Sequence, residues 1–148
     1  MRRIDHIGVV VDNLPEARAF LTVLGMTLDH GFDLGRVEAA FYRCGDVMIE
    51  VIECRTPEER ERRLGTAKAR IEHIAIQVDD LAATVDEFAS LGIEMTKPEP
   101  VRQDDIQSYW TNPDTSDGVM YQFFERLHEV DGHEHRAAPT PRPNEVEP

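Results

Sequence analysis

The chain contains an internal repeat with a period of 67 positions, and this repeat constrains the fold more than any other feature of the sequence. Residues 4–14 correspond to residues 71–81, and each copy runs on to a Leu-Gly pair, at 24–25 and at 91–92. A unit that occurs twice predicts two similar modules that pack together. The repeat also doubles one histidine. The matching tetrapeptides are Ile4-Asp5-His6-Ile7 and Ile71-Glu72-His73-Ile74.

Hydrophobic periodicity predicts the same order of elements in both modules, strand-helix-strand-strand-strand. The first module should have a helix from Pro15 to Leu24 and strands at 4–11, 26–28, 37–42 and 47–53. The second should have a helix from Leu81 to Leu91 and strands at 71–78, 94–96, 106–111 and 119–125. Thr56-Pro57-Glu58-Glu59 carries the signals of a helix start, and it predicts a short connecting helix between the modules.

These elements predict one α+β domain over residues 1–126, with modules at 3–54 and 70–126 and a linker helix at 55–69. Residues 127–148 are rich in Pro, Glu, His and Arg without periodicity, which predicts a disordered tail. The formal charge of −13 and the absence of a basic stripe argue against nucleic acid or an anionic membrane as partner. We find no targeting signal and expect a cytoplasmic protein whose two cysteines are reduced.

Four polar residues occupy matched positions in the repeat. The last strands of the modules align Glu50 with Gln122, just as the first strands align His6 with His73. Because side chains alternate across a strand, each of the four is the single polar group on a face of small or apolar neighbours. A buried glutamate is costly there unless it is paired or coordinated. Taken singly, each residue suits an ordinary capped or hydrogen-bonded role, but the doubled pattern favours an N2O2 site for one divalent ion: Ni, Co, Mn, Zn or Fe.

The repeat motifs, together with Gly45-Asp46 leading to Glu50 and Asn112-Pro113-Asp114 leading to Gly118, resemble the vicinal oxygen chelate superfamily, which comprises glyoxalases, bleomycin-resistance proteins and dioxygenases. The resemblance spans about residues 3–125. It implies tandem βαβββ modules whose curved mixed sheet forms a cup around one metal ion. It places His6, Glu50, His73 and Gln122 at the ligand positions and Met48, Gln77 and Phe124 in the lining of the cup. Among its members the chain resembles methylmalonyl-CoA epimerases and glyoxalase I enzymes.

The resemblance implies an isomerase, epimerase or lyase that forms an enediolate from a small carbonyl or thioester substrate, such as methylmalonyl-CoA or a lactoylglutathione precursor. Glu50 is the expected base, since a carboxylate beside a metal-bound carbonyl can remove the adjacent proton. The chain departs from the epimerase pattern because the acid and amide ligands exchange modules. The second epimerase glutamate falls at Leu34, with Glu38 and His30 nearby, so a two-base mechanism is not predicted.

Two other functions remain open at this stage. An Fe(II) extradiol dioxygenase would use two histidines and a glutamate, although Gln122 stands where its carboxylate is expected. A non-catalytic binding or resistance protein would have the same fold with an aromatic-lined cup, to which Tyr109 and Trp110 could contribute. In every case we expect a small-molecule ligand and a homodimer.

Overall fold

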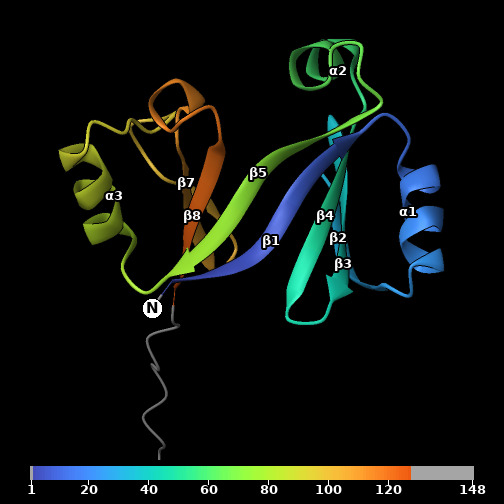
Figure 1. Cartoon of the computed structure of the whole chain (residues 1–148), viewed down its shortest axis with the longest axis horizontal. Coiled ribbons are helices and arrows are strands. Elements are labelled where there is room, and N and C mark those ends of the chain that lie inside the picture. Colours follow the sequence, from blue (N-terminus) through green and yellow to red (C-terminus); the bar gives the residue numbers. More distant parts are fainter. Residues whose placement is uncertain (1, 128–148) are drawn as a thin grey trace, which may run out of the picture.

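The two copies of the repeat form the two halves of one curved sheet. The computed structural model describes residues 2–127 (Figure 1). The first half contains β1 (Arg2–Val11), α1 (Leu14–Val23), β2 (Thr27–Asp33), β3 (Val37–Cys44) and β4 (Val47–Cys54). After α2 (Pro57–Arg63), the second half contains β5 (Ala69–Val78), α3 (Leu81–Ser90), β6 (Val101–Gln103), β7 (Ile106–Trp110), a 3₁₀ turn at Pro113–Thr115 and β8 (Met120–Arg126). The predicted α+β fold of paired βαβββ modules is confirmed.

The sheet is continuous across the two modules. Its strand order is β2-β3-β4-β1-β5-β8-β7-β6. Within each module the first strand pairs in parallel with the last, β1 with β4 and β5 with β8, and the modules join through the antiparallel pair β1–β5. These two central strands cross the middle of the molecule side by side, with α1 and α3 at opposite sides (Figure 1). The first strand of each module therefore lies at the centre of the sheet, where the two histidines are closest.

The flanking helices begin and end with equivalent signals. Asn13 and Asp80 cap α1 and α3 by accepting hydrogen bonds from the backbone N–H groups of Glu16 and Ala83. The first backbone N–H of each helix also donates to a glutamate on the last strand of its module, Leu14 to Glu53 and Leu81 to Glu125. Each helix ends at a Leu-Gly pair whose glycine has a positive φ, which side chains disfavour. The repeated local sequence thus fixes the same helix length twice.

The sheet has two faces with different contents, which we call the helix face and the cup face. On the helix face, α1 covers a cluster that includes Val11, Leu14 and Val51, and α3 covers a smaller one around Phe123. The cup face carries His6, Glu50 and His73. At one end of it an apolar cluster closes beneath Leu64, which follows α2: Val10, Val37, Ala39, Ile52, Cys54 and Leu64.

The second strand of the second module is not where periodicity placed it. Residues 94–96 make a single bridge, Met95 to Thr111, and the strand is β6, at Val101–Gln103. In the first module the strand expected at 26–28 extends to Asp33. Among the described residues no helix is both long and apolar enough to cross a membrane. Apart from Leu127, the tail predicted at 127–148 lies outside the described residues.

Candidate metal centre

Two histidines and one glutamate meet at the centre of the cup face. His6 Nε2 lies 3.3 Å from His73 Nε2 and 3.4 Å from Glu50 Oε2, and His73 Nε2 lies 3.3 Å from the same carboxylate oxygen. All three side chains are buried, with at most 8% of each exposed. One ligand atom from each residue lies within 4.8 Å of the other two. The structure therefore brings together three of the four residues that the sequence predicts as metal ligands.

The register of the central strands produces this meeting. Gly8 on β1 lies opposite Glu50 on β4 and opposite His73 on β5, so all three positions share one row of the cup face. The His73 ring lies directly over Gly8, because a Cβ added to Gly8 would be 2.1 Å from His73 Cε1. A side chain at position 8 would displace the ring. The glycine is therefore required by the close approach of an imidazole and not by its backbone angles.

A carboxylate lies beside the far nitrogen of each imidazole, although only His6 is hydrogen-bonded to it. His6 Nδ1 hydrogen-bonds to Asp5 Oδ2 at 2.9 Å, and His73 Nδ1 lies 3.6 Å from Glu72 Oε2. Neighbours on a regular strand point to opposite faces, but the β1–β5 ladder skips one residue between Ile4 and His6 and another between His73 and Ile71. The skipped residues are Asp5 and Glu72. These irregularities turn each acid toward its histidine, as bulges do beside functional sites.

Burial and the acidic neighbours oppose each other in setting the pKa values of the cluster. Burial lowers the pKa of His6, but hydrogen bonds to Asp5 and Glu50 outweigh it and raise the value to about 9. The pKa of His73 is raised in the same way, by Glu50 and Glu72 against burial. Burial raises the pKa of Glu50, yet its hydrogen bonds with the two imidazoles lower the value to about 2. The pKa of Glu50 is this low when both imidazoles are protonated, because their positive charges stabilise the carboxylate.

The charges of the cluster match a divalent cation. Three carboxylates surround the imidazoles, those of Asp5, Glu50 and Glu72, and the Arg63 guanidinium is hydrogen-bonded to Glu72, with Nε donating at 2.7 Å. Two negative charges are left over, and either two imidazolium ions or one divalent ion with neutral imidazoles can balance them. Ligand atoms about 2.0–2.1 Å from a tetrahedral zinc ion lie about 3.3 Å apart, which matches the three separations observed here. The residues present therefore fit a small divalent ion.

Substitution of Asp5 tests whether the carboxylate beside His6 supports metal binding. Replacing it with alanine removes the hydrogen bond that orients His6, and we expect the affinity for Zn²⁺ or Ni²⁺ to fall about 10- to 100-fold. Asp46→Ala, in the exposed turn after β3, is the matched control and should leave the affinity unchanged. Isothermal titration of the purified, untagged protein measures both. Equal affinities in the two variants would show that Asp5 does not support a metal site.

Gln122, the fourth predicted ligand, also lies on the cup face by register. The row that contains His6 runs through Ala75 to Gln122 on β8, so its side chain projects to the same side. Gln122 Nε2 donates to Ser108 Oγ at 3.2 Å, and the structure shows no hydrogen bond from Gln122 to His6, His73 or Glu50. Its role as a ligand stays a prediction. The bond to Ser108 leaves the amide oxygen, the atom that binds metal ions, without a hydrogen bond among the described residues.

The three residues predicted to line the cup all share its face by register. Met48 lies opposite His6, Gln77 opposite Arg3, and Phe124 opposite Gln77. The Phe124 ring is 2% exposed and stacks beside the His6 ring at a centroid distance of 6.5 Å. Whether they contact a substrate stays a prediction.

Sequence reasoning missed the supporting acids, although an acid before each histidine was the available signal. His30, to which the sequence assigned no role, lies on β2 and stacks on Phe41 at a centroid distance of 4.3 Å. The Phe41 ring in turn meets His6 edge-on at 5.1 Å. Glu38 pairs with Arg18 and Arg55. His30 is thus separated from His6 by the Phe41 ring.

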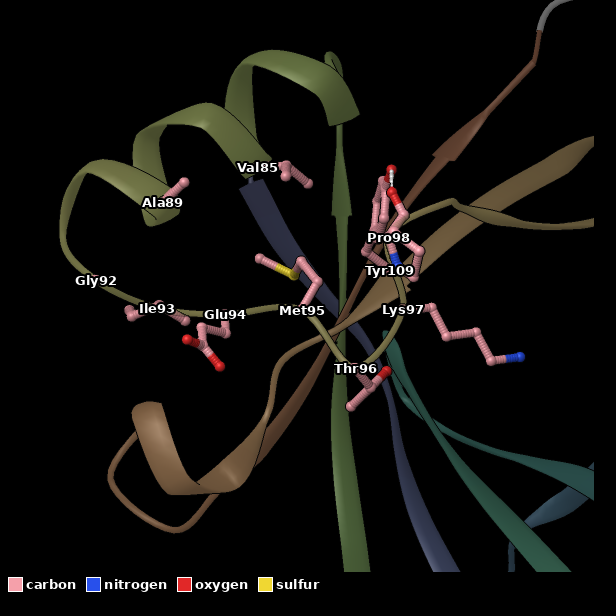
Figure 2. Close-up of a pocket in the computed structure, with 10 residues that line it drawn as sticks. All are labelled: Val85, Ala89, Gly92, Ile93, Glu94, Met95, Thr96, Lys97, Pro98 and Tyr109. Carbon is pink, nitrogen blue, oxygen red and sulfur yellow. Dashed lines mark hydrogen bonds between the residues drawn. The ribbon is translucent and has the colours of Figure 1, made fainter.

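One cavity of the structure lies away from this cluster. A hollow of about 620 Å³ opens between α3 and the segment 92–98, with Val85 and Met95 among its lining residues (Figure 2). Tyr109 closes one side, where its hydroxyl donates to the Pro98 carbonyl at 3.2 Å. Tyr109 packs in the cluster under α3, so this hollow belongs to the helix face. It contains none of the predicted ligands, and the chemistry of the cup argues for the metal centre as the functional site.

Comparison with known proteins gives the same family for most of the chain. The family model described as "Glyoxalase/Bleomycin resistance protein/Dioxygenase superfamily" matches residues 3–123. The uncharacterized protein YqjC of Bacillus subtilis (strain 168) is 39% identical over 56 residues, which are 36% of this chain and 40% of that protein. The match thus spans well under half the length of that relative.

Solved structures share the fold over nearly their whole length. The hypothetical protein BH1468 from Bacillus halodurans C-125 is 27% identical, with a TM-score of 0.73 over 88% of this chain and 99% of that one. A methylmalonyl-CoA epimerase from Mycobacterium tuberculosis is 20% identical, with a TM-score of 0.75 over 84% and 88%. A Streptomyces coelicolor methylmalonyl-CoA epimerase variant in complex with 2-nitronate-propionyl-CoA is 18% identical, with a TM-score of 0.72 over 85% and 98%. At such identities the epimerases establish the fold alone.

A doubled βαβββ sheet, a histidine from each half on its cup face, and a family model that covers residues 3–123 lead to one conclusion. The chain belongs to the glyoxalase/bleomycin resistance protein/dioxygenase superfamily.

Proposed function

We propose that the protein is a divalent-metal-dependent isomerase, epimerase or lyase that removes a proton beside the carbonyl of a small ketone or thioester. The observation that carries this proposal is the buried triangle of His6, Glu50 and His73, whose ligand atoms lie 3.3–3.4 Å apart. The epimerases of the same fold support it without identifying the substrate. We further propose Gln122 as the fourth ligand and a homodimer as the assembly.

The residues of the cluster have distinct tasks in this chemistry. His6 and His73 would hold the ion through Nε2; Asp5 orients the His6 ring by a hydrogen bond to Nδ1, and Glu72 lies beside Nδ1 of His73. A bound divalent ion supplies Lewis-acid stabilisation of negative charge at a substrate oxygen.

Glu50 is the base in this proposal. Its carboxylate takes the proton from carbon, and the electron pair of the broken C–H bond forms the double bond of the enediolate. Its buried surroundings exclude water that would compete for the proton. Return of the proton to the opposite face of the same carbon gives epimerisation, whereas return to the neighbouring carbon gives isomerisation.

A second candidate is an Fe(II) dioxygenase. The cluster consists of two histidines and one carboxylate, which is the ligand set of the facial triad in non-haem iron oxygenases. This reading needs open positions for oxygen and a catechol on the iron. Oxygen consumption with catechols by the Fe(II)-loaded protein is its measurement.

The proposed function is tested by metal content and proton exchange together. Protein purified without a His-tag should contain close to one divalent ion per chain, and it should exchange the α-proton of thioesters or hemithioacetals with deuterium from the solvent, followed by NMR. Chelation should abolish the exchange, and the metal ion should restore it. If the protein binds small molecules but binds no metal ion and exchanges no protons, it is instead a non-catalytic binding protein.

A further inference from the structure

The internal repeat allows the two ends of the cup to be compared position by position. At the end closed by Leu64, the first module is apolar throughout. The equivalent end of the second module replaces these residues with polar or aromatic ones, as judged from the strand registers. The matched pairs are Val10 with Gln77, Ala39 with Ser108, Ile52 with Phe124 and Cys54 with Arg126.

This difference distinguishes an end that stabilises the fold from one that is suited to bind a ligand. The apolar end is filled by its own core, and Val10 is fully buried there. At the polar end, Gln77 and Arg126 stand where the other module has a valine and a cysteine, and no helix of the described chain covers them as α2 covers the first module. Since two copies of one fold do not need this change for stability, the polar end requires another explanation.

Arg3 provides a cation at this polar end. It lies opposite Gln77 at the beginning of β1, and both its Nε and its terminal nitrogen donate to Gln77 Oε1, at 3.0 and 2.7 Å. The partner is a neutral amide, and Arg3 makes no ion pair with a carboxylate anywhere in residues 2–127. An arginine held in place by a neutral group keeps its charge available for an anionic ligand.

A second guanidinium flanks Phe124 at the same end. The guanidinium carbon of Arg126 lies 5.9 Å from the centre of the Phe124 ring, and the ion pair of Arg126 with Asp105 is long at 3.5 Å. Both guanidinium groups interact electrostatically with Asp5, the neighbour of His6, and Arg3 lies opposite Gln77, two residues along β5 from the partner of His6. The positive charges therefore lie close to the metal centre and not at a remote surface.

We propose that Arg3, Gln77 and Arg126 form a carboxylate-binding subsite, so that the substrate carries an anionic group in addition to its reacting carbonyl. The subsite occupies the row of the cup face next to that of His6, through the alignment of Arg3, Gln77 and Phe124. Rows two residues apart on a strand are separated by about 7 Å. A substrate that spans this distance places its carboxylate on the arginines and its carbonyl at the metal centre, with its carbon chain over Phe124.

This inference rests on the proposed function, because the length of the substrate is deduced from the distance between the subsite and the metal centre. Its substrate class is a short acid with a ketone or thioester carbonyl two or three carbons from the carboxylate. Neutral analogues of the same length would lose the charge-assisted hydrogen bonds, which carry orientation as well as affinity.

Malonate is a suitable probe, since it has two carboxylates and does not react. We expect malonate to bind the Zn²⁺-loaded variants Arg3→Gln and Arg126→Gln about 10- to 100-fold more weakly than the unaltered protein. Isothermal titration measures these affinities. Arg70→Gln is the matched control, because Arg70 is the repeat partner of Arg3 and faces the apolar end. It should bind malonate as the unaltered protein does. Arg3→Lys should recover part of the loss, and thermal denaturation checks that each variant is folded.

The outcomes separate this inference from the proposed function. If Arg3→Gln and Arg70→Gln bind malonate equally well, or if malonamide, which has the same length but no carboxylate, binds as tightly as malonate, the subsite is wrong even when proton exchange proceeds. If malonate binding depends on Arg3 but no carbonyl compound exchanges its proton, the subsite stands and the proposed function fails. A rise in KM for an acidic substrate in Arg3→Gln, with kcat little changed, would support both.

Discussion

Replacing Glu50 with glutamine is expected to reduce α-proton exchange by about 10²- to 10⁴-fold, the usual contribution of a positioned general base. The amide has nearly the shape of the carboxylate but cannot accept the proton. Glu50 is 6% exposed and its Oε2 is shared between the two imidazoles, so no other described carboxylate can take its place at this point. The measurement is deuterium incorporation under metal saturation, with metal content determined on the same sample.

Two controls distinguish a base from a ligand in this experiment. Glu87→Gln changes an acid on α3 whose side chain is 56% exposed, and it should leave exchange unaltered. The double variant Glu50→Gln with Gln122→Glu restores the charge of the proposed ligand set while moving the carboxylate to the other module. It should regain metal binding without regaining exchange of the same proton. Exchange at the normal rate in fully loaded Glu50→Gln would show that Glu50 is not the base.

The second large effect is a steep dependence of metal affinity on pH. In the metal-free protein the pKa of His6 is about 9, and that of His73 is also raised. A metal ion binds only the neutral imidazole, so each ion displaces the protons that these rings carry. The apparent affinity should therefore rise about tenfold per pH unit for each proton displaced, from pH 6 up to pH 9.

The stability of the metal-free protein should change in the opposite direction. A histidine whose pKa is raised by folding stabilises the folded state fully below its unfolded pKa near 6.5, and this contribution is lost as the pH rises through about 9. For His6 this is on the order of 3 kcal/mol. The unfolding temperature should thus fall between pH 6.5 and 9 without metal, whereas the stabilisation by added metal should grow over the same range.

Isothermal titrations in two buffers of different ionisation enthalpy count the protons released per ion, and thermal denaturation follows stability. His30→Gln is the control, since His30 has its own partner in Asp29 and a side chain that is 53% exposed. It should leave the proton count unchanged. A metal affinity that is independent of pH would show that the paired imidazoles are not the ligands.

Much of the fold was predictable because its signals are local and occur twice. Each helix is encoded by an Asn or Asp cap and a Leu-Gly end within about twelve residues, so α1 and α3 followed from periodicity. The strand predicted at 94–96 was wrong because the segment is apolar enough for a strand but finds only one bridge, at Met95. Strand identity depends on a partner in the sheet, and the neighbouring β6 takes that place.

The candidate site, like the fold, was predictable from the sequence only in part. Strand parity was sufficient to place His6, Glu50 and His73 on one face, because a period of two is a property of any strand. It was insufficient for Asp5 and Glu72, since an uninterrupted strand would turn both away from the histidines. Only a shift in the pairing between two distant strands redirects them.

By itself the sequence determined the doubled architecture, the helix ends and the equivalence of the two histidines, because each depends on contacts between near neighbours in the chain. The tertiary structure decided which end of the cup is filled and which is polar, how Arg3 meets Gln77, and how the supporting acids reach the imidazoles. These features arise from the register between β1 and β5, whose paired residues are about 60 to 80 positions apart. No local pattern encodes such a register, because it is set by the packing of the whole sheet.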